Sequence, residues 1–215
     1  MKKHSKLFGH LLLCSVVAIF SMAGMGCDDP LNVANPNSLV EQDLGNPTAA
    51  NAVANGALAT VARGWGEVIA PYSTATDEVI WIGSRDAWRD LDFGNVSFTG
   101  NEFTDDAMKF LHEGRWMADK AVAQLEEHNA NGDLADAEDL ARAYLYAGVA
   151  RIAIAEWFDD WTFSDKTAAA PNVGEANMNS VINDAIGLFG QAMSTAGSGE
   201  VHTQALAMTA RAKHM

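Results

Sequence analysis

Tryptophans in a stretch without regular periodicity are the residues of this sequence best suited to bind a ligand. Trp81 and Trp88 lie within residues 71–104, where short apolar pieces alternate with Gly, Ser, Asp and Asn. The face of an indole ring can stack on the apolar face of a sugar ring, and a guanidinium such as that of Arg85 can donate hydrogen bonds to sugar hydroxyls. We therefore predict a substrate-binding site at these three residues. The alternative is that these tryptophans, like Trp161 in a second irregular loop, only hold loops against helices.

The sequence contains no recognisable catalytic or metal-binding constellation. None of the four histidines that follow residue 27 stands in an H-E-x-x-H frame, and there is neither a G-x-S-x-G motif nor a phosphate-binding glycine loop. Adjacent carboxylates point in different directions, so helix capping or solvation is their simpler role. These pairs are Asp28-Asp29, Asp105-Asp106 and Asp159-Asp160. We expect a chain that is not an enzyme and that uses no metal and no cofactor.

The N-terminus has the pattern of an exported lipoprotein. Three lysines precede residues 11–23, an apolar run of thirteen residues that suits a signal peptide and is too short to span a bilayer. A small residue, Gly26, stands directly before Cys27. We predict cleavage after Gly26 and lipid attachment to Cys27; the alternative is a plain secretory signal. Because Cys14 would be removed with the signal, Cys27 would have no disulfide partner.

The charge balance limits the partners that the chain can have. Lys and Arg number 14 against 28 Asp and Glu, which gives a formal net charge of −14. So acidic a surface argues against binding nucleic acid, and against lying flat on anionic lipid. The length suits one domain. We expect a signal peptide at 1–26, an extended leader at 27–46 and a helical domain at 47–215.

Two long helices form the centre of the predicted domain. Apolar residues recur at spacings of three and four through residues 105–128, as is typical of an amphipathic helix, although Arg115 interrupts the stripe. The polar stretch 129–133 is expected to end this helix and to cap the next one, which covers about 137–155. Because the connecting turn is short, the two helices should form an antiparallel hairpin.

Small residues are expected to favour close packing in the helix at about 137–155 and to lower the stability of the helix at 47–65. Ala141, Gly148 and Ala155 recur every seven residues in the second helix of the hairpin, so another helix can approach this face closely. Gly56 and Gly64 should instead weaken the first helix of the domain, because glycine loses more backbone freedom on folding than alanine does.

The remaining elements complete a predicted all-α fold. Asn46 or Thr48 can cap the first helix of the domain, with Pro47 in its first turn, where a missing N–H costs nothing. The other predicted elements are helices at 47–65, 76–81, 176–196 and 201–215, and irregular loops at 71–104 and 158–171. Helix pairs of this kind favour a TPR-like helical-hairpin solenoid with long irregular loops. Since the last helix reaches Met215 without a cap, we expect the chain to stop inside an element.

Several short segments, in order along the chain, carry a resemblance to one protein family. They are the leader at 31–37, Asn55-Gly56-Ala57, Asp77-Glu78-Val79, and residues 114–119, 141–145, 156–160 and 205–213. With Cys27 and the acidic residues after it, their order resembles the N-terminal part of the SusD/RagB-like outer-membrane nutrient-binding lipoproteins. One binding loop of that family lies near the stretch from Trp81 to Trp88.

This resemblance implies a function as well as a fold. It implies a lipid-anchored position on the outer membrane, facing the exterior, and the capture of oligosaccharides or other nutrients. It also implies transfer of the nutrient to a TonB-dependent SusC-like β-barrel transporter. The runner-up function is an envelope-anchored helical-repeat scaffold that binds protein partners and has no small-molecule site. An anchored hydrolase comes third, and the missing catalytic constellation counts against it.

Overall fold

Helices and the loops between them account for all residues that the structure describes. The computed structural model describes residues 41–97, 99–165 and 167–215. Within these ranges the one strand-like pairing is an isolated bridge between Thr162 and Asn172. The predicted all-α fold is therefore confirmed. The predicted signal peptide, the lipid-attachment residue Cys27 and the first part of the predicted leader lie outside the described residues.

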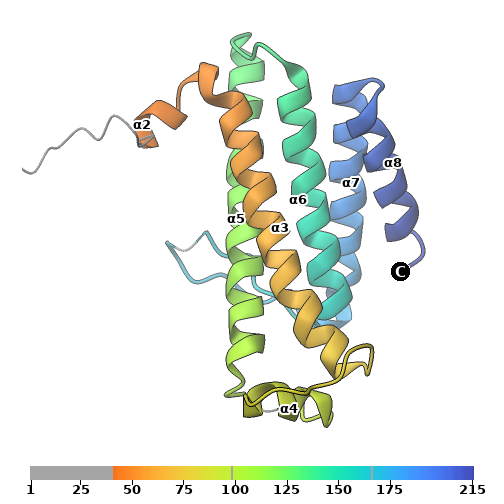
Figure 1. Ribbon diagram of the computed structural model, residues 1–215. Helices are drawn as coiled ribbons and strands as arrows, with labels where there is room; N and C mark the ends of the chain where they lie inside the picture. Colours follow the sequence, from red (N-terminus) through yellow and green to blue (C-terminus); the bar gives the residue numbers. More distant parts are fainter. Residues whose placement is uncertain (1–40, 98, 166) are drawn as a thin grey trace, which may run out of the picture. The chain divides into compact units, whose positions relative to one another are not determined.

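Within the described residues, the long helices α3, α5, α6, α7 and α8 follow one another, each antiparallel to the one before it (Figure 1). Consecutive long helices pack together, and α6 also packs against α3 and α8. The predicted helices at 176–196 and 201–215 are present as α7 and α8, but the prediction that the last helix reaches Met215 is wrong, because α8 ends at Ala212 and the backbone N–H of Lys213 bonds to the carbonyl oxygen of Thr209. The TPR-like solenoid stays a prediction, because a simple bundle shares this order. The elements are α2 Glu41–Leu44, η1 Pro47–Ala49, α3 Ala50–Ala75, α4 Asp86–Asp92, α5 Glu102–Asn131, α6 Ala137–Trp157, η2 Glu175–Asn177, α7 Asn179–Ala196 and α8 Glu200–Ala212.

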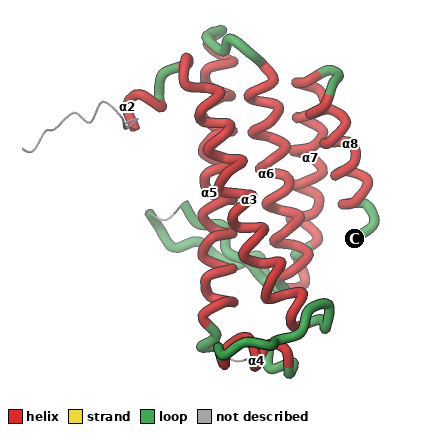
Figure 2. Tube along the Cα trace, viewed as in Figure 1, coloured by secondary structure: helices red, strands yellow, loops and turns green. Residues whose placement is uncertain are grey.

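Two loop regions interrupt the helical pattern (Figure 2). One surrounds α4 at the end of the domain where α3 ends and α5 begins. The other is the connection between α6 and α7, which passes alongside α5. These regions contain the two irregular stretches that the sequence predicts.

The described end of the predicted leader is not fully extended. Residues 41–44 form α2, so the prediction of an extended segment over 27–46 is wrong for this turn. The side-chain amide of Gln124 in α5 donates a hydrogen bond to the carbonyl oxygen of Leu44 at 2.5 Å. This bond satisfies a carbonyl that the end of a helix leaves unpaired. Next along the chain, Asn46 caps the turn that begins at Pro47, as predicted.

Helix α3 is longer than predicted and contains a proline. It ends at Ala75 rather than near Trp65, and Pro71 lies in its interior. A proline removes one backbone donor and normally ends a helix. In α3 only one turn follows Pro71, and the hydroxyl of Thr74 donates to the carbonyl oxygen of Ala70 at 2.9 Å. Val68 and Pro71 are buried, so the apolar face of α3 continues past the predicted end of the helix.

The prediction of a short helix at 76–81 is wrong. These residues form a turn and a loop, and the short helix of this region is α4, which begins at Asp86. Asp77 has a left-handed φ of 62°, which stops the helical hydrogen-bond pattern. Asp86 stands in the first turn of α4, where a carboxylate is favourable. The predicted loop at 71–104 is thus interrupted by the last turn of α3, by α4 and by the start of α5.

The predicted hairpin is confirmed, with one correction at its turn. The first helix, α5, extends beyond its predicted ends on both sides, from the cap at Asn101 to a left-handed Gly132 with φ of 76°. The prediction that 129–133 caps the second helix is wrong. Asp136 caps α6, because its carboxylate accepts the backbone N–H of Glu138 at 2.9 Å.

The backbones of α3 and α5 touch where two glycines face the partner helix. A Cβ on Gly64 would lie 2.8 Å from the Cα of Leu111. A Cβ on Gly114 would lie 2.8 Å from the carbonyl oxygen of Thr60. Both distances are too short for real atoms, so only glycine permits this approach. Gly64 costs some intrinsic helix stability, as predicted, but its missing side chain allows close packing.

The small-residue face of α6 is confirmed as a packing surface. Ala141 is fully buried. Gly148 lies directly against the ring of Phe189 in α7, at a distance that leaves no room for a side chain. Phe189 is itself fully buried. A large ring on one helix thus fills the hollow that glycine leaves on the next.

We predict that Gly64→Ala and Gly114→Ala each destabilise the protein by about 1–3 kcal/mol, because the new methyl group overpacks a backbone contact. Gly56→Ala is the matched control in α3. A Cβ at Gly56 meets no atom within 4 Å, so this change should stabilise the helix by about 0.5–1 kcal/mol. Urea unfolding followed by circular dichroism measures all three. Equal effects at the three positions would contradict the close approach.

Candidate functional site

The three predicted site residues line one pocket. Trp81, Arg85 and Trp88 border an open cavity of about 580 Å³ between the last turns of α3, the loop that follows it and the start of α4. Its other lining residues are Ile69, Ala70, Ser73, Thr74, Val79, Ile80, Ile82, Gly83 and Ser84. The structure therefore places the three residues of the predicted site around one cavity, and it adds an apolar wall from α3.

A tight turn after α3 directs the chain back over the pocket. The backbone N–H groups of Glu78 and Val79 donate to the carbonyl oxygen of Ser73 at 2.9 and 3.1 Å. The Ser73 hydroxyl donates to the carboxylate of Glu78 at 3.1 Å. Asp77, at the centre of this turn, holds the left-handed backbone conformation. The turn positions the apolar residues that follow it.

Trp81 is held by its backbone, while its side chain lines the pocket. Its backbone N–H donates to the carboxylate of Asp92 at 3.2 Å. The guanidinium of Arg89 lies 5.9 Å from the centre of its ring. The indole N–H of Trp81 is buried and has no acceptor among the described residues. An acceptor that reached this N–H would remove the cost of a buried unpaired donor.

Trp88 has both a structural contact and a face on the pocket. Its ring stacks on Phe103 of α5, with centroids 4.0 Å apart and planes 26° apart. Asn101 strengthens the same junction, because its side chain donates to the carbonyl oxygen of Ala87 at 2.8 Å while it caps α5. Trp88 lies in α4, and its stacking on Phe103 holds α4 against α5. The ring therefore has the structural contact of the alternative interpretation as well as a surface on the pocket. Sequence reasoning missed the contributions of Asn101 and Phe103.

Arg85 is the one charged residue that lines the pocket. Its guanidinium lies 3.4 Å from a carboxylate oxygen of Glu102, and the side chains of Arg85 and Glu102 are 65% and 56% exposed. Exposed ion pairs of this kind contribute about 0–1 kcal/mol. Arg85 can therefore exchange this partner for another anion at little cost.

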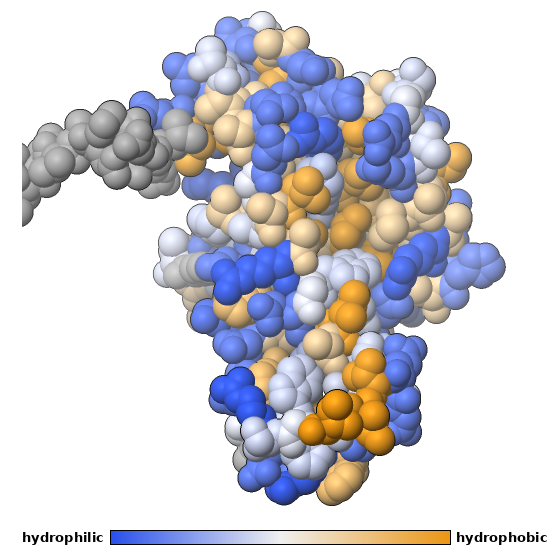
Figure 3. All heavy atoms as spheres, viewed as in Figure 1, coloured by the Kyte–Doolittle hydropathy of each residue, from blue (hydrophilic) through white to orange (hydrophobic). Residues whose placement is uncertain are grey.

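The rim of the pocket exposes large apolar side chains. Ile80 is 76% exposed and Ile82 is 92% exposed, and both flank Trp81 in the chain. Figure 3 shows strongly hydrophobic surface gathered at this end of the molecule. Contiguous exposed apolar surface commonly marks a binding site. In the sequence, the uninterrupted apolar run at 79–82 indicates this apolar surface.

The second loop does not join the pocket. Trp161 is only 1% exposed, and its ring stacks on His112 of α5 with centroids 3.9 Å apart. Phe158 meets the same indole edge-on at 4.9 Å. For Trp161 the structural interpretation is correct, because the ring fastens the loop to α5.

The buried Arg115 explains the interruption of the apolar stripe in α5. Its guanidinium pairs with Asp119 at 3.3 Å and donates to the carbonyl oxygen of Ser164 in the second loop. Arg151 of α6 reaches the other oxygen of Asp119 at 2.7 Å. Both guanidinium groups lie within 5.6 Å of the centre of the Phe163 ring. This cluster joins α5, α6 and the loop.

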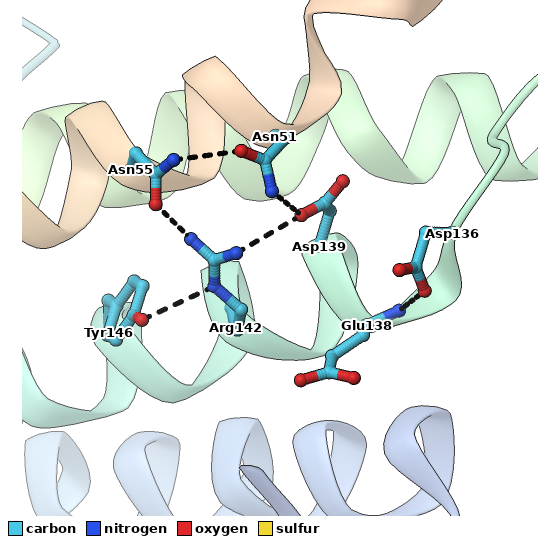
Figure 4. Close-up of polar contacts among 7 residues, drawn as sticks. All are labelled: Asn51, Asn55, Asp136, Glu138, Asp139, Arg142 and Tyr146. Atoms are coloured by element: carbon cyan, nitrogen blue, oxygen red, sulfur yellow. Dashed lines mark hydrogen bonds and ion pairs between the residues drawn. The ribbon is translucent and has the colours of Figure 1, made fainter.

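Another polar cluster joins α3 to α6 (Figure 4). Asp139 is buried and accepts hydrogen bonds from Asn51 at 3.0 Å and from Arg142 at 3.3 Å. Arg142 also donates to the side-chain oxygen of Asn55 and to the hydroxyl of Tyr146. Because its members are paired with one another, this cluster has a structural role.

Asp160 of the paired carboxylates organises the second loop. Its carboxylate accepts the side-chain amide of Asn172 at 2.8 Å, the backbone N–H of Gly174 at 2.6 Å and the N–H of Trp161 at 2.7 Å. The hydrogen bonds from Asn172 and Gly174 hold the pKa of Asp160 below its usual value of 3.8. Among the described residues no group of three or more His, Cys, Asp or Glu side chains is arranged to hold a metal ion.

Comparisons with protein-family models, with curated proteins and with solved structures found no match for this chain. Within the described part of the chain, no helix combines the length and the apolar character needed to cross a membrane.

We predict different stabilities for two tryptophan variants. Trp161→Ala should lower the free energy of unfolding by about 3–5 kcal/mol, because it empties a fully buried site. Trp81→Ala should cost less than about 2 kcal/mol, since the side chain is only half-buried beside an open pocket. Chemical denaturation of both variants provides the comparison. If Trp81→Ala were the more damaging change, Trp81 would belong to the core.

We predict that Asp160 contributes an acid-sensitive part of the stability. Because its pKa is lowered on folding, its stabilisation is complete above the unfolded value of 3.8 and is lost as the pH falls through the lower folded value. Asp160→Asn should therefore flatten the dependence of the melting temperature on pH below about pH 4. Asp159→Asn is the control variant, because Asp159 is the exposed neighbouring carboxylate and lies outside this set of hydrogen bonds. An identical acid profile for wild type and Asp160→Asn would refute the assignment.

Proposed function

We propose that this chain is a non-enzymatic, lipid-anchored binding protein that captures a nutrient at the pocket of Trp81, Arg85 and Trp88. The observation that supports the proposal is that these two tryptophans and this arginine line one cavity. Its volume of about 580 Å³ lies within the roughly 300–1,000 Å³ of small-molecule sites. The pocket combines an apolar wall with a few polar groups, as such sites usually do.

Oligosaccharides are the first ligand class to consider in this proposal. The indole rings of Trp81 and Trp88 offer apolar surface for a sugar face. The Arg85 guanidinium and the Ser84 hydroxyl stand beside them as hydrogen-bonding groups. A pocket at the end of the helical domain, open to solvent, suits a ligand of which only one or two rings are held.

The proposed location rests on the N-terminal sequence. Cys27 would carry the lipid, and acyl chains contribute about 0.8 kcal/mol for each buried CH₂ group, so two or more chains hold a protein firmly at a membrane. The chain would then face the exterior of the outer membrane. There it would pass its nutrient to a TonB-dependent SusC-like transporter, the partner that the family resemblance implies.

An envelope scaffold that binds protein partners is the second candidate function. The exposure of Ile80 and Ile82 favours it, because a contiguous exposed apolar surface can mark a protein-binding site. In this case no small molecule would compete for the pocket. Ligand screening therefore separates the two functions.

We predict that the double variant Trp81→Ala, Trp88→Ala weakens oligosaccharide binding about tenfold or more. Each aromatic contact contributes about 0.5–1.5 kcal/mol beyond buried area, and 1.4 kcal/mol is a factor of ten in affinity. A glycan array identifies the ligand, and calorimetry measures its affinity. Phe93→Ala is the matched control, because Phe93 is 74% exposed in the same region and does not line the pocket. Undiminished binding by the double variant would remove this pocket from the function.

A further inference from the structure

Arg85 gives the pocket a positive side chain, although acidic residues outnumber basic ones by two to one in the chain. Among the described lining residues it is the one with a charged side chain. Because Arg85 is paired with Glu102, an anionic ligand would replace that carboxylate as its partner.

The pairing of Arg85 in the structure indicates what kind of anion it can take. Its guanidinium lies 3.4 Å from the carboxylate of Glu102, and both side chains are more than half exposed. A guanidinium binds a carboxylate through a planar fork of donors. If a ligand carboxylate replaced that of Glu102, Glu102 would stay solvated in the first turn of α5, where the helix N-terminus stabilises its charge.

Aliphatic residues provide most of the remaining wall. Ile69 of α3 and Val79, Ile80 and Ile82 of the loop border the pocket, and each is at least 43% exposed. Covering such surface with an apolar molecule contributes about 25 cal/mol per Å² removed from water. Sugar hydroxyls placed against these side chains would lose hydrogen bonds to water without replacement.

We infer that the pocket selects a small apolar molecule that ends in one carboxylate. The apolar body packs against the isoleucines and the indole rings. The carboxylate accepts hydrogen bonds from the guanidinium of Arg85. This inference rests on the proposed function, in which the pocket is a nutrient site, and it replaces oligosaccharides with an apolar carboxylate as the class of nutrient.

A matched series of compounds tests the inference on the full chain. Isothermal titration calorimetry compares phenylbutyrate with phenylbutyramide, its uncharged amide, and with phenylbutylamine, its cationic counterpart. Phenylbutyrate should bind about tenfold more tightly than the amide, because a charged hydrogen bond is about twice as strong as a neutral one. The amine should bind most weakly.

Two variants assign this preference to the pocket. Arg85→Gln should bring the acid to the affinity of the amide. Lys109→Gln removes an exposed positive charge on α5 outside the pocket and should leave the preference intact.

The outcomes distinguish this inference from the proposed function. Equal affinities of acid and amide, or an acid preference that survives Arg85→Gln, overturn the carboxylate inference. If oligosaccharides then bind in a manner that depends on Trp81 and Trp88, the proposed function stands without it. If neither the acids nor the oligosaccharides bind, both are overturned.

Discussion

The contact between the backbones of α3 and α5 determines where the candidate site forms. Gly64 and Gly114 let the two helices approach until a methyl group on either would touch backbone atoms of the other. Towards the pocket, Val68 of α3 lies in one buried cluster with Ala107 and Leu111 of α5. Ile69 and Ser73 come from one side of this junction, and Glu102 comes from the other. A wider helix spacing would separate the apolar wall of the pocket from the residues that steady α4.

Much of the helical scaffold could be predicted from the sequence, because amphipathic periodicity reports directly which face of a helix is buried. The hairpin and the two helices after it follow this rule. Periodicity failed where a tertiary contact overrides local preference. Pro71 favours an earlier end for α3, yet the apolar face of the helix continues past it. The sequence pattern also did not predict that Gly64 allows close packing of α3 on α5. The spacing of apolar residues along a helix contains no information on the distance between helices.

The sequence predicted the aromatic and charged residues of the candidate site, but it did not predict the apolar wall that α3 contributes. Trp81, Arg85 and Trp88 stand close together in the chain, so a single loop could be expected to present them. Ile69 belongs to another element, and only the fold places it beside them. Trp161 looked similar in sequence but is buried against α5. Loop tryptophans share one composition signal whether they bind a ligand or fasten a loop, and the neighbours that decide between these roles are distant in the chain.

A double-mutant cycle on Gly64 and Gly114 tests most directly whether a single close contact between α3 and α5 sets the position of the pocket. The unfolding free energies of Gly64→Ala, Gly114→Ala and the double variant are measured by denaturant titration under the same conditions. If the two glycines share one helix contact, the first methyl group already separates the helices, so the double variant should cost at least about 0.5 kcal/mol less than the sum of the single variants. Additive effects within about 0.3 kcal/mol would show that the two positions act independently, and would contradict a single close contact that sets the pocket.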